Sequence, residues 1–490
     1  MTGNDVNHPS PEEVGGLVKT SAKWVLIFLV IRQLSTIVAT ALLSRMVSPA
    51  ETGLFSMAAI VASFVVLFDT GLVWATVQAS SMSEKKISSL VAMNMVVGVG
   101  VYIICAASGP VIAGFFDEPK LIHVMLVLGL APAFNSLATQ FSALLKRQLR
   151  NKEVGSVEFS SIVISSVLAV LVAWLGGGVW ALVSQLVFLN FFRCIFFYRK
   201  YEGRIHLSLN REGLSVFVQG GKLALSNYVC FFQLYMGQIL VGKFFGAEVL
   251  GYYGKALALR ALPLNYMAMI ATDIVVASIA AMSVTGSERN AFYLKSVAMV
   301  GFFGCGLMGL LYPLAYEVVD ILYGDQWTQV AKILQIMVFA GLIMPFVSAA
   351  TWMFLGRGMA KGQLHINIVN TLISLVAYIF IWKISRDVFD FVLYESVLMA
   401  ALAVTTMYWA SRCCDFDFSG LIYVALVCIA AAITAALIVG WLPQSATVKA
   451  DISLYHVLGV ISVYGLIYSL VCVTLLRDLR DFIFERLKLK

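Results

Sequence analysis

Long apolar runs dominate this chain, and short polar stretches separate them. Runs of about 20 apolar residues can cross a hydrocarbon core of ~30 Å as helices. The pattern therefore predicts an all-α integral membrane fold of about fourteen transmembrane helices, about seven in each half. The segments at 213–243 and 249–282 are over-long, so we expect tilt or kinks there. The expected segments are 22–44, 54–79, 88–115, 121–145, 157–175, 178–198, 213–243, 249–282, 292–319, 329–355, 364–385, 389–410, 420–441 and 453–476.

Two similar motifs recur along the chain. LSRMVSPAETGLF runs from Leu43 to Phe55, and VGKFFGAEVLGYY runs from Val241 to Tyr253. A cation, a small residue three places later, a Gly eight places later and then an aromatic residue recur at the same offset (251 − 53 = 198). LKRQ at 145–148 and LGRG at 355–358 form a second pair, each following a Pro. Two similar helical halves are how many transporters are built.

The apolar runs and the repeat predict four parts. Residues 1–21 are expected to form a cytoplasmic N-terminal tail, because they contain no short apolar core ahead of a cleavage site. The N-terminal lobe is expected at 22–204 with helices one to six, and the core of the second lobe at 205–410 with helices seven to twelve. Residues 411–490 would supply the last two helices and a basic cytoplasmic C-terminal tail.

Composition and charge agree with a membrane protein. Hydrophobic residues make up 60% of the chain and charged residues 12%, with a mean hydropathy of +0.90, far outside the range of soluble domains. With the N-terminus inside, 22 Lys and Arg fall on the cytoplasmic side and 6 on the other. This asymmetry places both termini in the cytoplasm. The net charge of +7 then reflects loops that face anionic membrane lipids, and no nucleic-acid partner is expected.

The sequence contains no feature that predicts an enzyme. No loop exceeds roughly 20 residues, which is too short for a separate catalytic domain. The Gly-Lys pairs lack the rest of a phosphate-binding loop, and the five His are scattered without metal-ligand spacing. Most of the eight Cys lie in apolar runs, so structural disulfides are not expected. We expect no cofactor, no metal and no catalytic residues.

Polar residues inside the apolar segments are the candidate site. A charge at mid-membrane costs about 2.5–3.5 kcal/mol on insertion scales, so it needs a reason. Guanidinium and ammonium groups suit the oxygens of a phosphate or diphosphate, and side-chain amides suit sugar hydroxyls. We therefore expect a polar cavity between the two halves, with Asp69 and Asp273 as candidates for ion coupling. The expected substrate-binding residues are Arg32, Lys222, Arg260, Gln233, Asn227 and Gln238.

Structural alternatives exist for each charge. Arg32 could pair with Asp69 instead of facing a cavity. Lys222 could extend its side chain to the cytoplasmic surface. Arg260 could bind backbone carbonyl groups that Pro263 leaves without a donor.

Five segments in order resemble the Wzx-type polysaccharide flippases of the multidrug/oligosaccharidyl-lipid/polysaccharide exporter superfamily. They are SAKW at 21–24, LSRMVSPAETGLF at 43–55, FSALLKRQLRNK at 141–152, VGKFFGAEVLGYYGKALAL at 241–259 and LYGDQWTQVAKILQIM at 322–337. The chain is most similar to the branch that exports colanic-acid-like and other exopolysaccharide units.

The resemblance implies two lobes of about seven helices related by a pseudo-two-fold axis, in the bacterial inner membrane. It also implies a substrate of sugars on undecaprenyl diphosphate, moved by alternating access between two open states for exopolysaccharide or O-antigen biosynthesis. Partners implied are membrane lipids and the polymerase and chain-length regulator of the same pathway. The family has no single fixed site motif, so Arg32, Lys222 and Arg260 take the role of cavity cations by analogy.

Other functions stay open from the sequence. A drug or cation antiporter of the same superfamily would want a membrane-buried acid. An integral-membrane polysaccharide polymerase or glycosyltransferase would need a large outer loop or an acidic pair that faces its donor. A non-transporting scaffold would not require cations inside its helices.

Overall fold

The computed structural model describes residues 11–78, 83–203, 211–281, 286–441 and 454–476. For some residues inside these helices only the backbone is described. The predicted basic tail beyond residue 476 and the first ten residues lie outside the described ranges. All regular structure in the described ranges is helical, without a strand.

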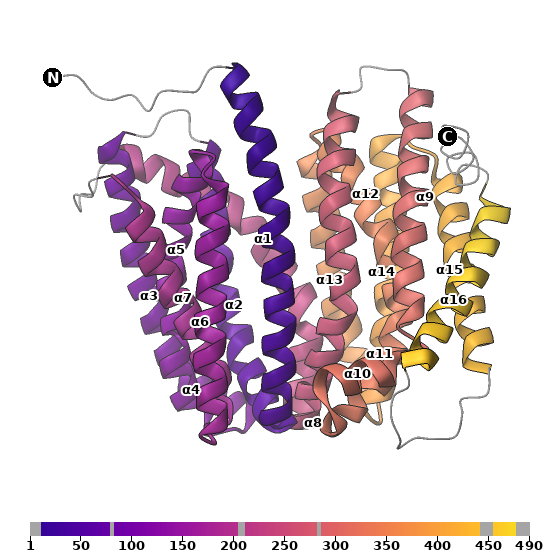
Figure 1. Ribbon diagram of the computed structural model, residues 1–490, viewed down its shortest axis with the longest axis horizontal. Helices are drawn as coiled ribbons and strands as arrows, with labels where there is room; N and C mark the ends of the chain where they lie inside the picture. Colours follow the sequence, from indigo (N-terminus) through magenta and orange to yellow (C-terminus); the bar gives the residue numbers. More distant parts are fainter. Residues whose placement is uncertain (1–10, 79–82, 204–210, 282–285, 442–453, 477–490) are drawn as a thin grey trace. The chain divides into compact units, whose positions relative to one another are not determined.

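The helices of the first half begin with α1 (Pro11–Met46), α2 (Pro49–Gln78) and α3 (Glu84–Phe116). They continue with α4 (Leu121–Leu128), α5 (Leu130–Arg147), α6 (Asn151–Trp174), α7 (Val179–Lys200) and the long α8 (Arg211–Ala281). Then follow α9 (Gly286–Leu310), α10 (Ala315–Tyr323), a 3-10 turn (Asp325–Trp327), α11 (Thr328–Gly341), α12 (Met344–Gly356), α13 (Ala360–Ile384), α14 (Val388–Cys414), α15 (Phe418–Trp441) and α16 (Leu454–Leu475) (Figure 1).

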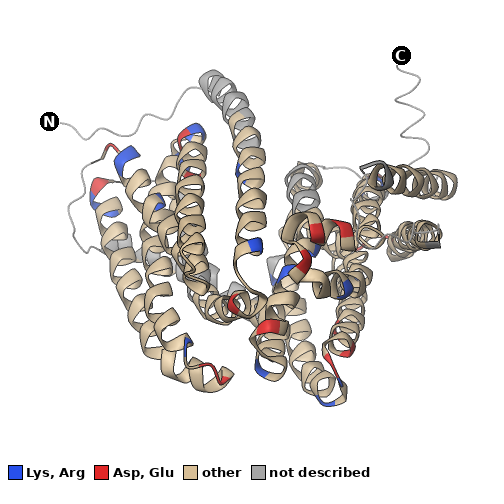
Figure 2. Ribbon diagram, turned by 60° about the horizontal axis from the view of Figure 1, so that its bottom comes forward, with Lys and Arg blue, Asp and Glu red and all other residues tan. Residues whose placement is uncertain are grey.

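The expectation of an all-α membrane fold is confirmed. Ten described helices are long and apolar enough to cross a membrane, and the bent pair Asp325–Gly341 and Met344–Gly356 would make an eleventh. Figure 2 shows that neutral residues occupy most of the helix lengths and that charged residues are few. The chain is a multi-pass membrane protein.

Several predicted segments differ from the helices found, as two examples show. The segment at 292–319 was wrong at its end, because α9 stops at Leu310 and a separate helix, α10, starts at Ala315. Pro313 lies in the turn between them, and a proline inside a helix removes a backbone hydrogen bond. The segment expected at 22–44 begins earlier, since α1 starts at Pro11.

The boundary expected between the segments 213–243 and 249–282 lies inside α8, at Gly246, while the tilt or kinks expected within those segments stay a prediction. Gly246 has φ 84° and ψ 177°, so two helices join there at a non-helical residue. Only glycine adopts this conformation without strain. Gly246 is also the small residue of the second repeat motif, at the place where Ser48 lies in the first.

The chain divides into two compact units, Met1–Gly251 and Tyr252–Lys490, called unit 1 and unit 2. In unit 1, α6 packs on α1 and α7, and α5 packs on α2, α3 and α7. In unit 2, α9 packs on α15, while α14 packs on α11, α12 and α13. The division falls within α8, whereas the sequence predicted a boundary between residues 204 and 205. Two compact units do not test a division into four parts, so the four-part organisation stays a prediction.

The two repeat motifs touch each other within unit 1, through their glycines. A Cβ added to Gly53 would lie 1.6 Å from the carbonyl oxygen of Ala247, and one added to Gly251 would lie 2.2 Å from that of Pro49. The contact is reciprocal, because residues 49 and 53 of the first motif correspond to 247 and 251 of the second at the same offset of 198. Backbones can approach this closely in a membrane only where both side chains are absent or small.

Replacing Gly53 by Ala is therefore expected to destabilise the protein by about 1–3 kcal/mol, the usual range for overpacking. An alanine in place of glycine inside a helix would otherwise favour the fold by ~1 kcal/mol. Gly100→Ala in α3 is the matched control, since its new Cβ would meet no atom within 4 Å. The measurement is the temperature at which purified protein in detergent loses its monodisperse state. Equal values for the two variants would contradict the close contact.

Candidate functional site

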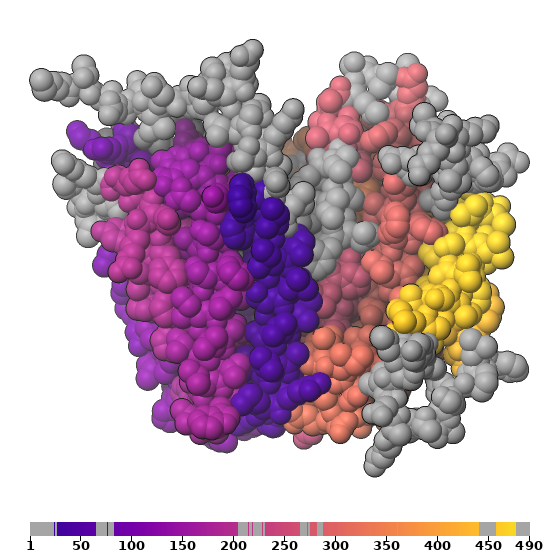
Figure 3. All heavy atoms as spheres, viewed as in Figure 1, coloured from indigo at the N-terminus to yellow at the C-terminus, as the bar shows by residue number. Residues whose placement is uncertain are grey.

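Arg32 lies on α1, which runs along the surface of unit 1 (Figure 3). Its side chain is exposed, and among the described residues its guanidinium makes no hydrogen bond or ion pair. Thr36 follows one turn later on the same face, and its hydroxyl donates to the carbonyl oxygen of Arg32 at 2.9 Å. The side chain of Asp69 lies outside the described residues, so the alternative of an Arg32–Asp69 pair is not tested.

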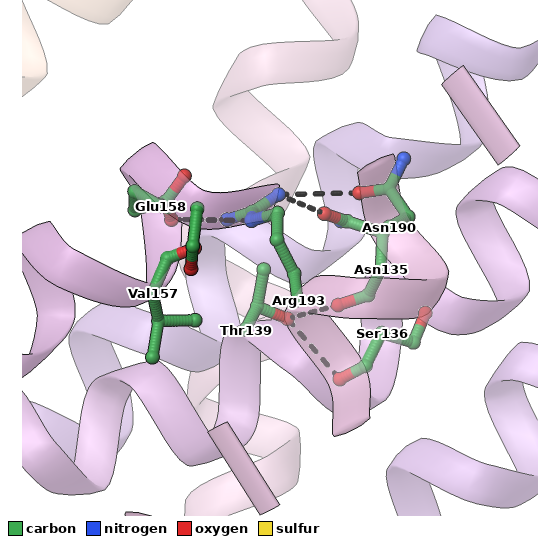
Figure 4. A network of polar contacts seen from close by, with 8 residues as sticks. Asn135, Ser136, Thr139, Val157, Glu158, Asn190 and Arg193 are labelled. Atoms are coloured by element: carbon green, nitrogen blue, oxygen red, sulfur yellow. Dashed lines mark hydrogen bonds and ion pairs between the residues drawn. The ribbon is translucent and has the colours of Figure 1, made fainter. Parts of the chain in front are cut away.

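The sequence did not predict a polar network centred on Arg193. This network is linked to Arg32 only electrostatically, through Lys146. Arg193 of α7 donates from Nη2 and Nε to Glu158 of α6 at 2.7 and 3.1 Å. Its Nη1 donates to the side-chain oxygens of Asn135 and Asn190, both at 3.2 Å. Figure 4 shows these four side chains converging from α5, α6 and α7. The guanidinium is thus held by partners on three helices.

The network extends to a cluster of three cations and one carboxylate. Glu158, Arg193 and Arg32 all act electrostatically on Lys146, near the end of α5. Glu158 lies seven residues after the start of α6, and Arg193 seven before the end of α7, or ~10 Å along each helix. We name Arg32, Lys146, Glu158 and Arg193 the unit 1 cluster. Its excess of positive charge makes it suited to an anionic ligand.

The polar end of α6 is fixed by a salt bridge outside the membrane-spanning segments. Arg150 donates to Glu153 at 2.7 Å and to Glu202 at 3.0 Å. The hydrogen bond to Glu153 is the main cause that raises the pKa of Arg150. The guanidinium thereby ties the start of α6 to the segment after α7.

Unit 2 contains a second network, which the sequence analysis also missed. Glu395 of α14 is only 8% exposed. The hydroxyl of Tyr253 on α8 lies 2.8 Å from both of its carboxylate oxygens, and the hydroxyl of Tyr378 on α13 donates at 2.7 Å. Arg260 acts electrostatically on Glu395, yet its guanidinium makes no hydrogen bond or ion pair in the described part of the chain. We name Tyr253, Arg260, Tyr378 and Glu395 the unit 2 cluster.

Of the remaining predicted site residues, the structure describes the side chains of only two. Gln233 and Gln238 are half-buried on α8, and neither side chain hydrogen-bonds a described residue. The side chains of Lys222, Asn227 and Asp273 lie outside the described residues. Among those that are described, no group of three His, Cys, Asp or Glu could hold a metal ion.

Arg32, Gln233 and Gln238 belong to unit 1 and Arg260 belongs to unit 2. The single cavity predicted between the halves therefore stays a prediction. Glu158, Arg193 and Glu395 could have been found from the sequence, because each is a charge inside a predicted apolar segment. Their partners could not, since Asn135, Tyr253 and Tyr378 come from other helices.

The family described as polysaccharide biosynthesis protein matches residues 42–332, more than half of the chain. The chain belongs to this family. The teichuronic acid biosynthesis protein TuaB of Bacillus subtilis is 24% identical over 347 residues, 70% of this chain and 72% of that protein. The lipopolysaccharide biosynthesis protein WzxC of Escherichia coli is 21% identical over 371 residues, 74% of each chain.

Solved structures share the fold. The lipid II flippase MurJ in an inward closed conformation has a TM-score of 0.72 at 13% identity, covering 93% of this chain and 99% of that one. An inward-facing multidrug resistance transporter of the MATE family, in the MOP superfamily, has a TM-score of 0.60 at 16% identity, covering 81% and 99%. The resemblance inferred from the five sequence segments is confirmed.

Arg193→Met is expected to lower the free energy of unfolding by about 2–3 kcal/mol, because it leaves Glu158 half-buried without its cation. The loss is smaller than the ~3–5 kcal/mol of a fully buried pair, since both side chains keep about one-fifth of their exposure. The double variant Arg193→Met/Glu158→Leu should recover most of it, because no charge is left unpaired. Thermal unfolding followed by tryptophan fluorescence measures both. A double variant as unstable as the single one would show that the ion pair itself is not what Arg193 contributes.

Proposed function

We propose that the protein is a flippase that moves oligosaccharide units linked to undecaprenyl diphosphate across the bacterial inner membrane. The observation that carries the proposal is intramembrane positive charge without a paired anion, in a chain of this family. Arg32 and Arg260 have no ion-pair partner among the described residues, and the unit 1 cluster has three cations for one carboxylate. A diphosphate supplies the anionic oxygens that such groups bind.

The relatives support the same substrate class. TuaB, WzxC and the succinoglycan biosynthesis transport protein ExoT of Rhizobium meliloti are named for three different bacterial polysaccharides. A fold shared with a lipid II flippase fits a lipid carrier that bears sugars. The diversity of these polymers leaves the sugar composition of the unit open.

The mechanism follows from what a hydrocarbon core excludes. A charged, sugar-bearing head group cannot cross that core unaided, whereas cations and side-chain amides offer it compensating contacts. Arg32, Lys222 and Arg260 would bind the diphosphate, and Gln233, Asn227 and Gln238 would bind the sugars. The lipid tail would stay in the bilayer while the protein alternates between two open states. Both termini face the cytoplasm, as the Lys and Arg distribution indicates.

A drug or cation antiporter is the alternative within the same fold. Such a protein needs a membrane-buried acid that is open to a cation. The described acid that comes nearest to this is Glu395, but two tyrosine hydroxyls already occupy both of its oxygens. The unpaired arginines also repel a cation. The flippase is therefore the better match, and no catalytic role is assigned.

The proposal is tested in a deletion strain that accumulates its lipid-linked unit at the cytoplasmic face. Arg32→Ala and Arg260→Ala are expected to reduce delivery to the outer leaflet at least tenfold, since each removes a charge that binds the diphosphate. Arg386→Ala is the matched control, because it removes the same charge from an exposed position between α13 and α14. Delivery is measured as units accessible from outside, at equal protein levels.

Full delivery by both variants would overturn the assignment of these arginines. If units reached the outer leaflet without the protein and only stayed unpolymerised, the flippase itself would be overturned in favour of a polymerase.

A further inference from the structure

Glu395 is the most enclosed carboxylate whose partners are fully described. Its two oxygens receive Tyr253 and Tyr378 at 2.7–2.8 Å, and the side chain is almost completely covered. Burying a carboxylate is costly unless hydrogen bonds and a positive charge compensate it. Two neutral hydroxyls supply only part of that compensation. Arg260 adds a further, electrostatic contribution.

The geometry places these groups at related depths in unit 2. Glu395 lies seven residues after the start of α14, and Tyr378 six before the end of α13, so both lie ~10 Å from the same turn between those helices. Tyr253 and Arg260 are seven residues apart on α8, hence on one helix face. Arg260 therefore lies about two turns further along the face that carries Tyr253 to Glu395.

Arg260 attracts Glu395 without contacting it. The two interact electrostatically, but no ion pair within 4 Å joins them. A guanidinium has five donors, and none of those of Arg260 is used by a described residue. The carboxylate of Glu395 therefore balances the charge of Arg260, while the N–H donors of Arg260 stay available to another anion.

We propose that Glu395 is a proton-exchanging counter-ion of Arg260. Its carboxylate balances the arginine while the site is empty, and it takes up one proton from water when a diphosphate binds Arg260. The inference rests on the proposed function, because it takes Arg260 as a ligand of the diphosphate. No other bond forms or breaks in this step, and the diphosphate's charge takes over the role that the carboxylate gives up.

The tyrosines allow both states of the carboxyl group. A phenol hydroxyl can donate or accept a hydrogen bond. Once Glu395 carries the proton, Tyr253, which touches both oxygens, can accept a hydrogen bond from the new carboxyl O–H while Tyr378 continues to donate. The groups that face Glu395 are Tyr253 and Arg260 from α8 and Tyr378 from α13. From α11, α12 and α15, which also pack on α14, no ionisable side chain among the described residues acts on it. Glu395 is thus the acid in this cluster that would be protonated, and so neutralised, when an anion binds.

The test is calorimetric titration of the purified full chain with geranylgeranyl diphosphate in detergent. Titrations in two buffers of different ionisation enthalpy give the number of protons taken up on binding. The wild type should take up about one proton, so that its Kd rises about tenfold for each pH unit. Glu395→Gln, a fixed neutral group, should bind without that proton and with a Kd that changes little with pH. Glu288→Gln, which removes an exposed acid from unit 2, should behave as wild type.

Tyr378→Phe provides a second measurement, which should not change if Glu395 has only a structural role. It removes one of the two hydroxyls that hold the carboxylate, so the pH dependence of the Kd should differ from that of the wild type. No proton uptake by the wild type, or equal uptake by wild type and Glu395→Gln, would overturn the inference. A wild type that binds no diphosphate overturns it as well. Such a result leaves the flippase standing if delivery in the deletion strain depends on the protein, and removes both if it does not.

Discussion

The close approach of two helix starts, α2 and the second part of α8, is the constraint on which the rest of the fold depends. Water cannot drive helices together inside a membrane, so backbones must come near enough for dispersion and packing to hold them. Gly53 and Gly251 permit this reciprocally, against the carbonyl groups of Ala247 and Pro49. Gly246, at φ 84°, interrupts the helix beside that contact. The break in α8 thus lies beside the contact between the two motifs.

Much of the fold could be predicted from the sequence, because a lipid-exposed helix requires a run of apolar residues that is visible without any tertiary information. The breaks were harder. Hydropathy left a gap between the segments 213–243 and 249–282, where Gly246 divides α8, but it did not locate the break between α9 and α10, where Pro313 lies. The functional cations were only partly predictable. Arg32 and Arg260 stand out as charges in apolar runs, while Glu395 becomes meaningful only with Tyr253, which lies 142 residues away in sequence.

The two polar clusters show how the same problem, charge inside a membrane, has two solutions in one chain. In the unit 1 cluster, Arg193 is saturated by Glu158 and two asparagines, so this guanidinium fixes helices to each other. In the unit 2 cluster two tyrosine hydroxyls hold the acid, and no described residue holds the arginine. Saturated groups hold a structure together, and unsaturated ones can bind a ligand.

The reciprocal glycine contact has a consequence for how the chain could diverge. A duplicated sequence is free to change one copy while the other keeps the original role, provided that the copies do not depend on each other. At positions 49, 53, 247 and 251 they do depend on each other, since a larger residue in one motif would meet the backbone of the other. Arg260 and Glu395 lie outside both motifs, so a change at either position would not meet this contact.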